Sequence, residues 1–182
     1  MMFTPTGLEG AFLVDIEPHN DERGFFARSF CQNEFAARGI TPRLVQCNIS
    51  GNCKKGTLRG LHYQMAPRQE AKLVRCTAGA IYDVIIDLRP HSPTRLRHFG
   101  AVLSRENRRA MYVPEGFAHG FLTLADDSEV LYQLSEFYDP DSARGLRWND
   151  PAFGIAWPEQ PVTISQRDAT YPDFIDNVRD VR

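Results

Sequence analysis

The chain has 182 residues, 42% of them hydrophobic, which is enough for one well-packed core and short for two. A single domain spanning residues 1–182 is therefore expected. Its 21 Lys and Arg against 23 Asp and Glu give a net charge of -2, with no long run of one sign. This balance argues against a dedicated nucleic-acid or anionic-membrane surface, so any anion site must be local.

The first residues lack a basic stretch followed by an apolar one, and no window approaches the roughly 18 apolar residues of a membrane span. A cytoplasmic location is therefore expected. Four cysteines, Cys31, Cys47, Cys53 and Cys76, form no CxxC pair. Reduced thiols are expected in preference to disulfides or a zinc site.

Short apolar or alternating segments recur about every 8 to 12 residues between Gly, Pro, Asn and Asp, a pattern typical of a β-sandwich or barrel. One short helix is predicted from Gln32 to Arg38, with Gly39 ending it. The fold class is therefore all-β. The predicted strands are 11–17, 24–30, 43–50, 57–63, 71–77, 79–88, 97–104, 109–113, 117–124 and 128–137.

Side-chain parity places three polar groups on apolar strand faces, because successive strand residues point to opposite sides. His62 shares a face with Leu58 and Gly60. By the same parity Lys72 falls with Val74 and Cys76, and Tyr132 with Val130 and Leu134. Burying such groups is costly unless hydrogen bonds or a function compensate, and a barrel lumen would bring them together. A structural role for His62 and Tyr132 stays open at this point.

Asp83 and Asp87 interrupt a nearly continuous apolar strand from Ala80 to Arg89. They are either a surface-facing or salt-bridged pair, or Asp83 orients a histidine such as His119. The later segment is rich in Trp, Pro and Asp, and is predicted to cover the β-core irregularly. Such a tail would let Asp168 approach a strand from outside the sheet.

Histidine is the side chain best able to take up and return a proton near neutral pH. A carboxylate bound to its second ring nitrogen fixes the tautomer. No GxSxG elbow supports a hydrolase triad. Neither GxGxxG nor GxxxxGK[ST] occurs, so a bound phosphate would have to be held by arginines such as Arg59 and Arg167.

A metal site is the alternative, because the segments Gly56–His62 and Pro114–His119 resemble the two cupin signatures. Metal-binding cupins carry a second histidine two residues after the first, and this chain has Gln64 there. His62, His119 and Glu70 would be left as ligands, which disfavours a tight divalent site. No metal or other cofactor is expected, while the cupin barrel itself gains support.

Four longer motifs together resemble the dTDP-4-dehydrorhamnose 3,5-epimerases. They are Leu58-Arg59-Gly60-Leu61-His62-Tyr63-Gln64, Lys72-Leu73-Val74-Arg75, Val113-Pro114-Glu115-Gly116-Phe117-Ala118-His119-Gly120-Phe121 and Gly145-Leu146-Arg147-Trp148-Asn149-Asp150-Pro151. The resemblance runs from about Leu13 to Asp168. It implies a jelly-roll cupin barrel with a few short helices, an irregular C-terminal tail and no metal, acting on a nucleotide-linked 4-keto-6-deoxyhexose.

The resemblance also implies roles for four residues. The C4 ketone acidifies the protons on C3 and C5, and the enzyme removes a proton from one face and returns one to the other. In the family pattern His62 is the base and Asp168 holds it. Lys72 supports the developing enolate oxygen, and Tyr132 is the acid on the opposite face.

Substrate contacts follow from the same resemblance. Arg59 and Arg167 would hold the pyrophosphate, and Gln46 and Asn48 would face the nucleotide base. His119 would line the sugar site. Phe137 and Tyr138 are assigned to the nucleotide side of the pocket.

The resemblance further implies a homodimer in which an N-terminal segment, residues 21–26, completes the neighbouring site. Arg23 would contact phosphate there and Phe26 would contact the base. Two positions depart from the family pattern: Arg28 stands where glutamate is common, and Phe137 where a larger or hydroxylated aromatic is common. Both lie on the nucleotide side, so the identity of the base stays open.

Three alternatives to C3 and C5 epimerisation remain at this point. One is a C3-only epimerase, acting on a related and possibly non-thymidine nucleotide sugar. The second is a metal-dependent cupin oxygenase or isomerase. The third is a non-catalytic protein that binds sugar nucleotides.

Overall fold

The computed structural model describes residues 1–40 and 43–176 of the chain. Within these ranges it is built almost entirely of short strands with two helices of about one turn. The elements are β1 Met2–Pro5, β2 Phe12–Asp15, β3 His19–Asp21, β4 Gly24–Phe26, α1 Gln32–Ala36, β5 Gln46–Asn52, β6 Thr57–Gln64, β7 Lys72–Ala78, β8 Ala80–Asp87, β9 His98–Ser104, β10 Ala110–Val113, β11 Phe117–Thr123, β12 Ser128–Leu134, β13 Ala143–Gly145, β14 Thr163–Ile164 and α2 Gln166–Ala169. The prediction of an all-β fold is confirmed.

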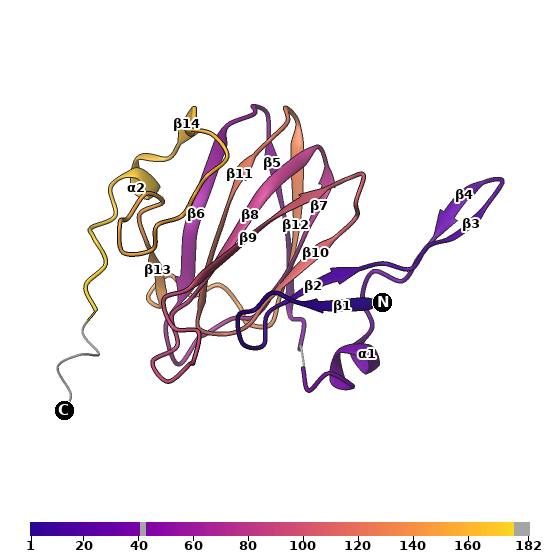
Figure 1. Cartoon of the computed structure of the whole chain (residues 1–182), viewed down its shortest axis with the longest axis horizontal. Helices are drawn as coiled ribbons and strands as arrows, with labels where there is room; N and C mark the ends of the chain where they lie inside the picture. The colour runs from indigo at the N-terminus through magenta and orange to yellow at the C-terminus, as the bar shows by residue number, and fades with distance from the viewer. Residues whose placement is uncertain (41–42, 177–182) are drawn as a thin grey trace.

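Two antiparallel sheets face each other and form the body of the molecule (Figure 1). The first sheet has the order β1-β2-β10-β7-β12-β5, and the second has the order β13-β6-β11-β8-β9. β14 adds to the outer side of β6 in parallel. Neighbours in each sheet are mostly distant in sequence, as in a jelly roll.

The space between the sheets is filled by alternate residues of both, as the period of two requires. Val74 of β7 and Met111 of β10 meet Ile85 of β8 and Phe121 of β11 there, all fully buried. Tyr132 of β12 packs against this inner cluster. The inward parity predicted for Tyr132 is therefore confirmed.

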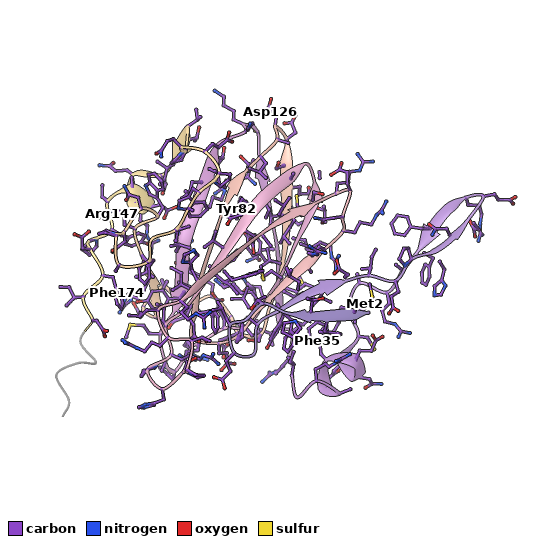
Figure 2. The ribbon with its side chains drawn as sticks, in the orientation of Figure 1. Met2, Phe35, Tyr82, Asp126, Arg147 and Phe174 are labelled. Atoms are coloured by element: carbon purple, nitrogen blue, oxygen red, sulfur yellow. The ribbon has the colours of Figure 1, made fainter. Side chains whose placement is uncertain are left out.

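A second apolar cluster covers the outer face of the first sheet. Phe35 of α1 is fully buried between the helix and the N-terminal strands (Figure 2), with its ring 4.9 Å from that of Phe3. The helix ends at Ala36, two residues before the predicted Arg38, but Gly39 terminates it as predicted: Gly39 has a φ of 73°, and the Ile40 N–H donates to the Phe35 carbonyl. This is a Schellman turn, which glycine adopts without a steric penalty.

The C-terminal tail covers the outer face of the second sheet. Phe153 and Leu146 pack on Leu61 and Val84 there, and the Trp157 ring meets Tyr82 at 6.1 Å. Tyr82 is labelled on this face in Figure 2. The predicted irregular cover is therefore confirmed, and it carries β14 and α2 onto the edge of β6.

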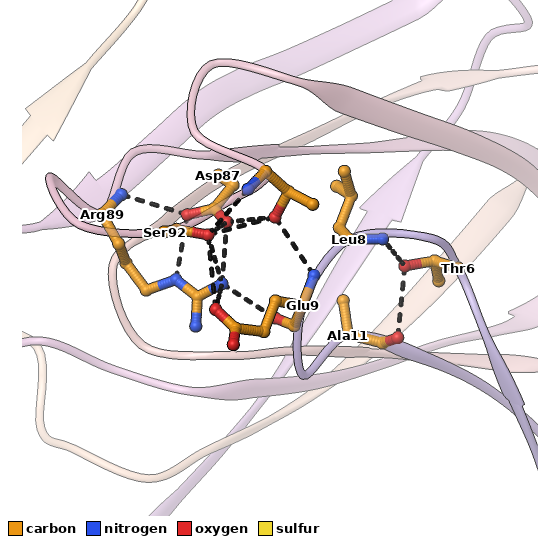
Figure 3. Close-up of polar contacts among 8 residues, drawn as sticks. Thr6, Leu8, Glu9, Ala11, Asp87, Arg89 and Ser92 are labelled. Atoms are coloured by element: carbon orange, nitrogen blue, oxygen red, sulfur yellow. Dashed lines mark hydrogen bonds and ion pairs between the residues drawn. The ribbon is translucent and has the colours of Figure 1, made fainter.

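Asp87 lies at the end of β8 and is fully buried in a polar network (Figure 3). It accepts hydrogen bonds from Arg89, Ser92 and Thr94, and Thr94 in turn accepts from the Glu9 N–H at 3.1 Å. Burial alone would raise the pKa of Asp87, but these donors outweigh it and lower the pKa. Asp87 is therefore salt-bridged, as one reading predicted, but it is not at the surface.

The predicted strand 24–30 differs most from the structure. β4 covers only 24–26 and forms a hairpin with β3, which projects away from the body as a separate arm (Figure 1). The predicted strand 128–137 ends earlier, at Leu134. Among the described residues no helix is long and apolar enough to cross a membrane.

Candidate active site

A pocket of about 870 Å³ lies between the two sheets and the C-terminal tail. All predicted site residues line it except Arg23, Phe26 and Phe137. Strand register explains much of this convergence, because His62 of β6 pairs directly with His119 of β11 and both point inward. Lys72 pairs with Leu134 of β12, so β7 and β12 supply the opposite wall.

His62 is held from outside the sheet by Asp168. Their Nε2 and Oδ1 atoms are 2.7 Å apart, and the other carboxylate oxygen accepts from the Gly60 N–H at 3.2 Å. Ser165 caps α2 by accepting a hydrogen bond from the Asp168 N–H. Asp168 is only 4% exposed, whereas the His62 side chain is 45% exposed and faces the pocket.

The protonation of this pair follows from its surroundings. Burial alone would raise the pKa of Asp168, but hydrogen bonds from His62, Gly60 and Ser165 outweigh it and lower the pKa. An ionised Asp168 accepts only, so the His62 Nε2 carries the proton. The Nδ1 lone pair is then available to take a proton from a bound molecule.

Lys72 supplies a buried ammonium beside this base. Its Nζ lies 3.0 Å from Glu70 Oε1 and donates to the His62 carbonyl oxygen at 3.3 Å. Both side chains are nearly buried, and Glu70, in the segment just before β7, supplies the carboxylate that pairs with Lys72. The pocket therefore holds the Lys72 side chain against the carbonyl oxygen of His62.

A second histidine–aspartate pair lies on the neighbouring strands. His119 Nε2 and Asp83 Oδ1 are 2.7 Å apart, and both residues are buried. Asp83 stands opposite Phe121, two residues along β11 from His119, so it reaches His119 diagonally across one sheet face. The reading in which Asp83 orients His119 is therefore the one that the geometry supports.

Tyr132 completes the inner wall from the other sheet. Its ring lies 5.9 Å from that of His119 at an interplanar angle of 79°. Burial, and secondarily the charge of Asp83, raise the pKa of Tyr132, although Arg59 acts in the opposite direction. The phenol is thus kept protonated at neutral pH and can donate a proton.

Three arginines line the pocket without a carboxylate partner among the described residues. One is Arg144, which donates to the backbone carbonyl oxygens of Asp141 and Ala143. Arg59 donates to Asn52 Oδ1 at 2.7 Å, and the Arg167 guanidinium lies 5.8 Å from the centre of the Tyr171 ring. Other arginines, such as Arg89 and Arg109, pair with aspartates. The uncompensated charge of Arg59 and Arg167 suits an anionic ligand.

Comparison with known proteins agrees with this geometry. Residues 5–176 match the family model described as dTDP-4-dehydrorhamnose 3,5-epimerase. The chain belongs to the dTDP-4-dehydrorhamnose 3,5-epimerase family. The enzyme of that name from Shigella flexneri is 42% identical over 172 residues, which cover 94% of each chain.

Solved structures of this epimerase family superpose closely. The Bacillus anthracis dTDP-4-dehydrorhamnose 3,5-epimerase, with TDP and PPi bound, gives a TM-score of 0.91 at 39% identity, covering 95% of this chain and 99% of that one. A 3'-monoepimerase from Streptomyces bikiniensis, in complex with dTDP-quinovose, gives 0.85 at 34% identity, covering 93% and 86%. These two similar structures are named for different reactions, one as a 3,5-epimerase and the other as a 3'-monoepimerase.

Gln46, Asn48 and Tyr138 also line the pocket. The Gln46 amide donates to Asn48 at 3.2 Å and accepts from the Tyr138 N–H at 3.4 Å. Phe137 is 56% exposed and does not line the pocket of the isolated chain. Its carbonyl instead accepts from Gln64, so Phe137 flanks the site through its backbone.

Arg23 and Phe26 lie on the projecting β3–β4 hairpin, on the side of the body away from β13, β14 and α2 (Figure 1). The Arg23 side chain is 84% exposed and pairs with Asp21, and Phe26 is 78% exposed. Arg28 lies after the hairpin, where it donates to Glu34 at 2.7 Å. None of the three reaches the pocket of its own chain.

The third donor of the metal alternative is already engaged. Glu70 pairs with the Lys72 ammonium, whose positive charge would repel a metal cation beside it. Gln64, at the position of the second cupin histidine, uses its amide to hold the loop 137–139. The described residues contain no group of three ligand side chains placed to hold a metal ion.

The sequence analysis did not identify three contacts around the site: Glu70 with Lys72, Tyr171 with His62, and Asn52 with Arg59. Glu70 lies two residues before Lys72 and just outside β7, so the short spacing, and not strand parity, is the signal for their pairing. Tyr171 is different, because its ring occupies the space beside His62 that a side chain at Gly145 would need: a Cβ there would lie 2.1 Å from the ring. That contact and the one between Asn52 and Arg59 depend on the fold and leave no local signal.

Proposed function

We propose that the pocket epimerises C3 and C5 of a dTDP-linked 4-keto-6-deoxyhexose through an enolate, with no metal or other cofactor. The observation that carries the proposal is His62, fixed by Asp168 with Nδ1 free, facing a buried phenol from the opposite sheet. Lys72 supplies a cation that lines the same pocket and contacts the His62 carbonyl oxygen. The family membership supports the same reaction.

In the proposed chemistry the His62 Nδ1 takes a proton from the carbon next to the ketone. The electron pair of that C–H bond moves to the ketone oxygen, and the Lys72 ammonium stabilises the negative charge there. Tyr132 then gives its hydroxyl proton to the opposite face of the carbon. Proton exchange with solvent restores the neutral phenol and the free imidazole nitrogen before the second carbon reacts.

The remaining lining residues suit a nucleoside diphosphate. Arg59 and Arg167 carry unpaired charge and are proposed to bind the two phosphates. Gln46, Asn48 and Tyr138 offer amide and aromatic contacts for the base. His119, held by Asp83, is proposed to contact the sugar.

Incubation with dTDP-4-dehydro-6-deoxyglucose in deuterated water tests this function. Deuterium should enter both C3 and C5, and NMR of the recovered sugar nucleotide should show both positions inverted. Binding without any exchange would show a non-catalytic nucleotide-sugar protein and overturn the proposal.

Substituting Tyr132 by phenylalanine should separate the two faces of the reaction. The variant keeps the ring packed against His119 but loses the donor, so His62 can still exchange protons while inversion fails. We expect deuterium to enter with retained configuration, chiefly at C5. Equal and total loss of exchange and inversion would contradict separate roles for His62 and Tyr132.

A C3-only epimerase is the second candidate, and the similarity to the Streptomyces bikiniensis 3'-monoepimerase supports it. The two candidates share the same base, cation and acid. The deuterium experiment distinguishes them, because uptake and inversion would then be confined to C3.

A homodimer is proposed to complete the site, with the β3–β4 hairpin of each chain entering the pocket of the other. The hairpin supports this because it projects from the body and exposes Phe25, Phe26 and Arg23. An apolar arm in water is unfavourable unless a partner covers it. Arg23 would contact the phosphate and Phe26 would contact the base.

A cytoplasmic location of the protein stays a prediction.

Mixing two inactive variants tests the exchanged hairpin. His62→Ala removes the base from one chain, and the double variant Arg23→Ala/Phe26→Ala removes the arm contacts from the other. If arms are exchanged, a hybrid dimer has one intact site, and random mixing should restore about one quarter of wild-type activity. If each arm served its own chain, mixing after subunit exchange would restore nothing.

A further inference from the structure

Asn52, at the end of β5, holds the guanidinium of Arg59 on β6. The Arg59 Nε donates to Asn52 Oδ1 at 2.7 Å, and Nη2 reaches the Gly51 carbonyl oxygen at 3.4 Å. Arg59 has no carboxylate partner among the described residues, although it lines the pocket. Its direction is therefore set by Asn52 and the backbone beside it.

The Asn52 amide can face Arg59 in only one way. Its Nδ2 donates to the carbonyl oxygens of Ser50 and Ser128, each at 3.1 Å, and the residue is 4% exposed. Both amide hydrogens are therefore used, and Oδ1 must point at Arg59. An amide fixed by two other bonds is a rigid acceptor.

The acceptor is the uncharged amide of Asn52, and this affects what Arg59 can bind. Arg109 makes the corresponding Nε contact with the Asp15 carboxylate at 2.9 Å, and Arg89 does so with Asp87. Those carboxylates neutralise their arginines. An amide instead orients the guanidinium and leaves its full positive charge for a ligand.

We propose that Asn52 is a positioning residue that aims Arg59 at the diphosphate of the substrate. This inference rests on the proposed function, in which Arg59 binds phosphate. It assigns to Asn52 a contribution to nucleotide affinity that acts only through Arg59. Asn52 itself does not line the pocket.

A double-mutant cycle on dTDP binding tests this. Calorimetry would measure Kd for the full chain and for Arg59→Ala, Asn52→Ala and the double variant. Arg59→Ala should weaken binding roughly 30-fold and Asn52→Ala roughly fivefold, because a misdirected guanidinium keeps its charge but loses its geometry. In the Arg59→Ala background, the Asn52 substitution should have no further effect. With substrate, KM for Asn52→Ala should rise about as much as Kd.

The outcomes separate the two proposals. If Asn52→Ala weakens binding by the same factor with and without Arg59, its role is general stability and the inference is overturned. If Arg59→Ala binds dTDP as tightly as wild type, the phosphate assignment fails as well. Asn52→Ser, which keeps a small polar side chain, serves as the second variant if alanine prevents folding, and thermal unfolding reports that separately.

Discussion

Replacing His62 by alanine should lower kcat about 10³-fold and abolish deuterium exchange at both carbons, because general-base catalysis typically contributes two to four powers of ten. His119 has the same contact between Nε2 and a carboxylate, but its side chain is only 4% exposed, whereas that of His62 is 45% exposed and faces the pocket. Exchange would be followed by NMR in deuterated water. Substrate binding should change much less than kcat.

A matched control for this prediction is His91→Ala. His91 is exposed in the loop after β8, away from the pocket, so its loss should leave exchange unchanged. Asp168→Asn is the informative intermediate: it preserves the shape of the pair while removing the charge that favours a proton on Nε2. Wild-type exchange in the His62→Ala variant would show that the base has been assigned to the wrong residue.

Replacing Lys72 by methionine should have two separable effects. Loss of the cation proposed to stabilise the enolate oxygen should lower kcat by roughly 10² to 10³. The same change leaves Glu70 nearly buried without its partner, which should destabilise the fold by about 3 kcal/mol. Steady-state kinetics and thermal unfolding would measure the two effects independently.

The double variant Glu70→Gln/Lys72→Met distinguishes catalysis from folding. Removing both charges should restore most of the lost stability, because no unpaired carboxylate then remains. Activity should stay as low as in Lys72→Met. Recovery of activity together with stability would show that Lys72 matters only as the partner of Glu70.

Much of the fold was predictable because its strands are short and alternate cleanly. The predicted strand 57–63 stops one residue before the end of β6, and the predicted strand 79–88 exceeds β8 by one residue at each end. The prediction of a strand at 24–30 was wrong because Phe25 and Phe26 lie on an arm outside the body, where no sheet extends the ladder past Phe26, while Phe30 packs on Phe35 of α1. Residues with aromatic β-propensity then predict a longer strand than forms.

The site was predictable where strand parity applies and hidden where it does not. Parity placed Lys72 and Tyr132 inward without reference to any relative. The partner of His62 lies on a one-turn helix in an irregular tail, and only the family resemblance identified Asp168. Asn52 and Tyr171 act through contacts between segments far apart in the chain, so no local pattern reveals them.

The position of α2 has a consequence for how the enzyme is made. Asp168 is 106 residues beyond His62, on an element that follows every strand of both sheets. During synthesis the sheets can form while the histidine still lacks its carboxylate. A growing chain therefore contains the strands of both sheets before it contains the carboxylate that holds His62.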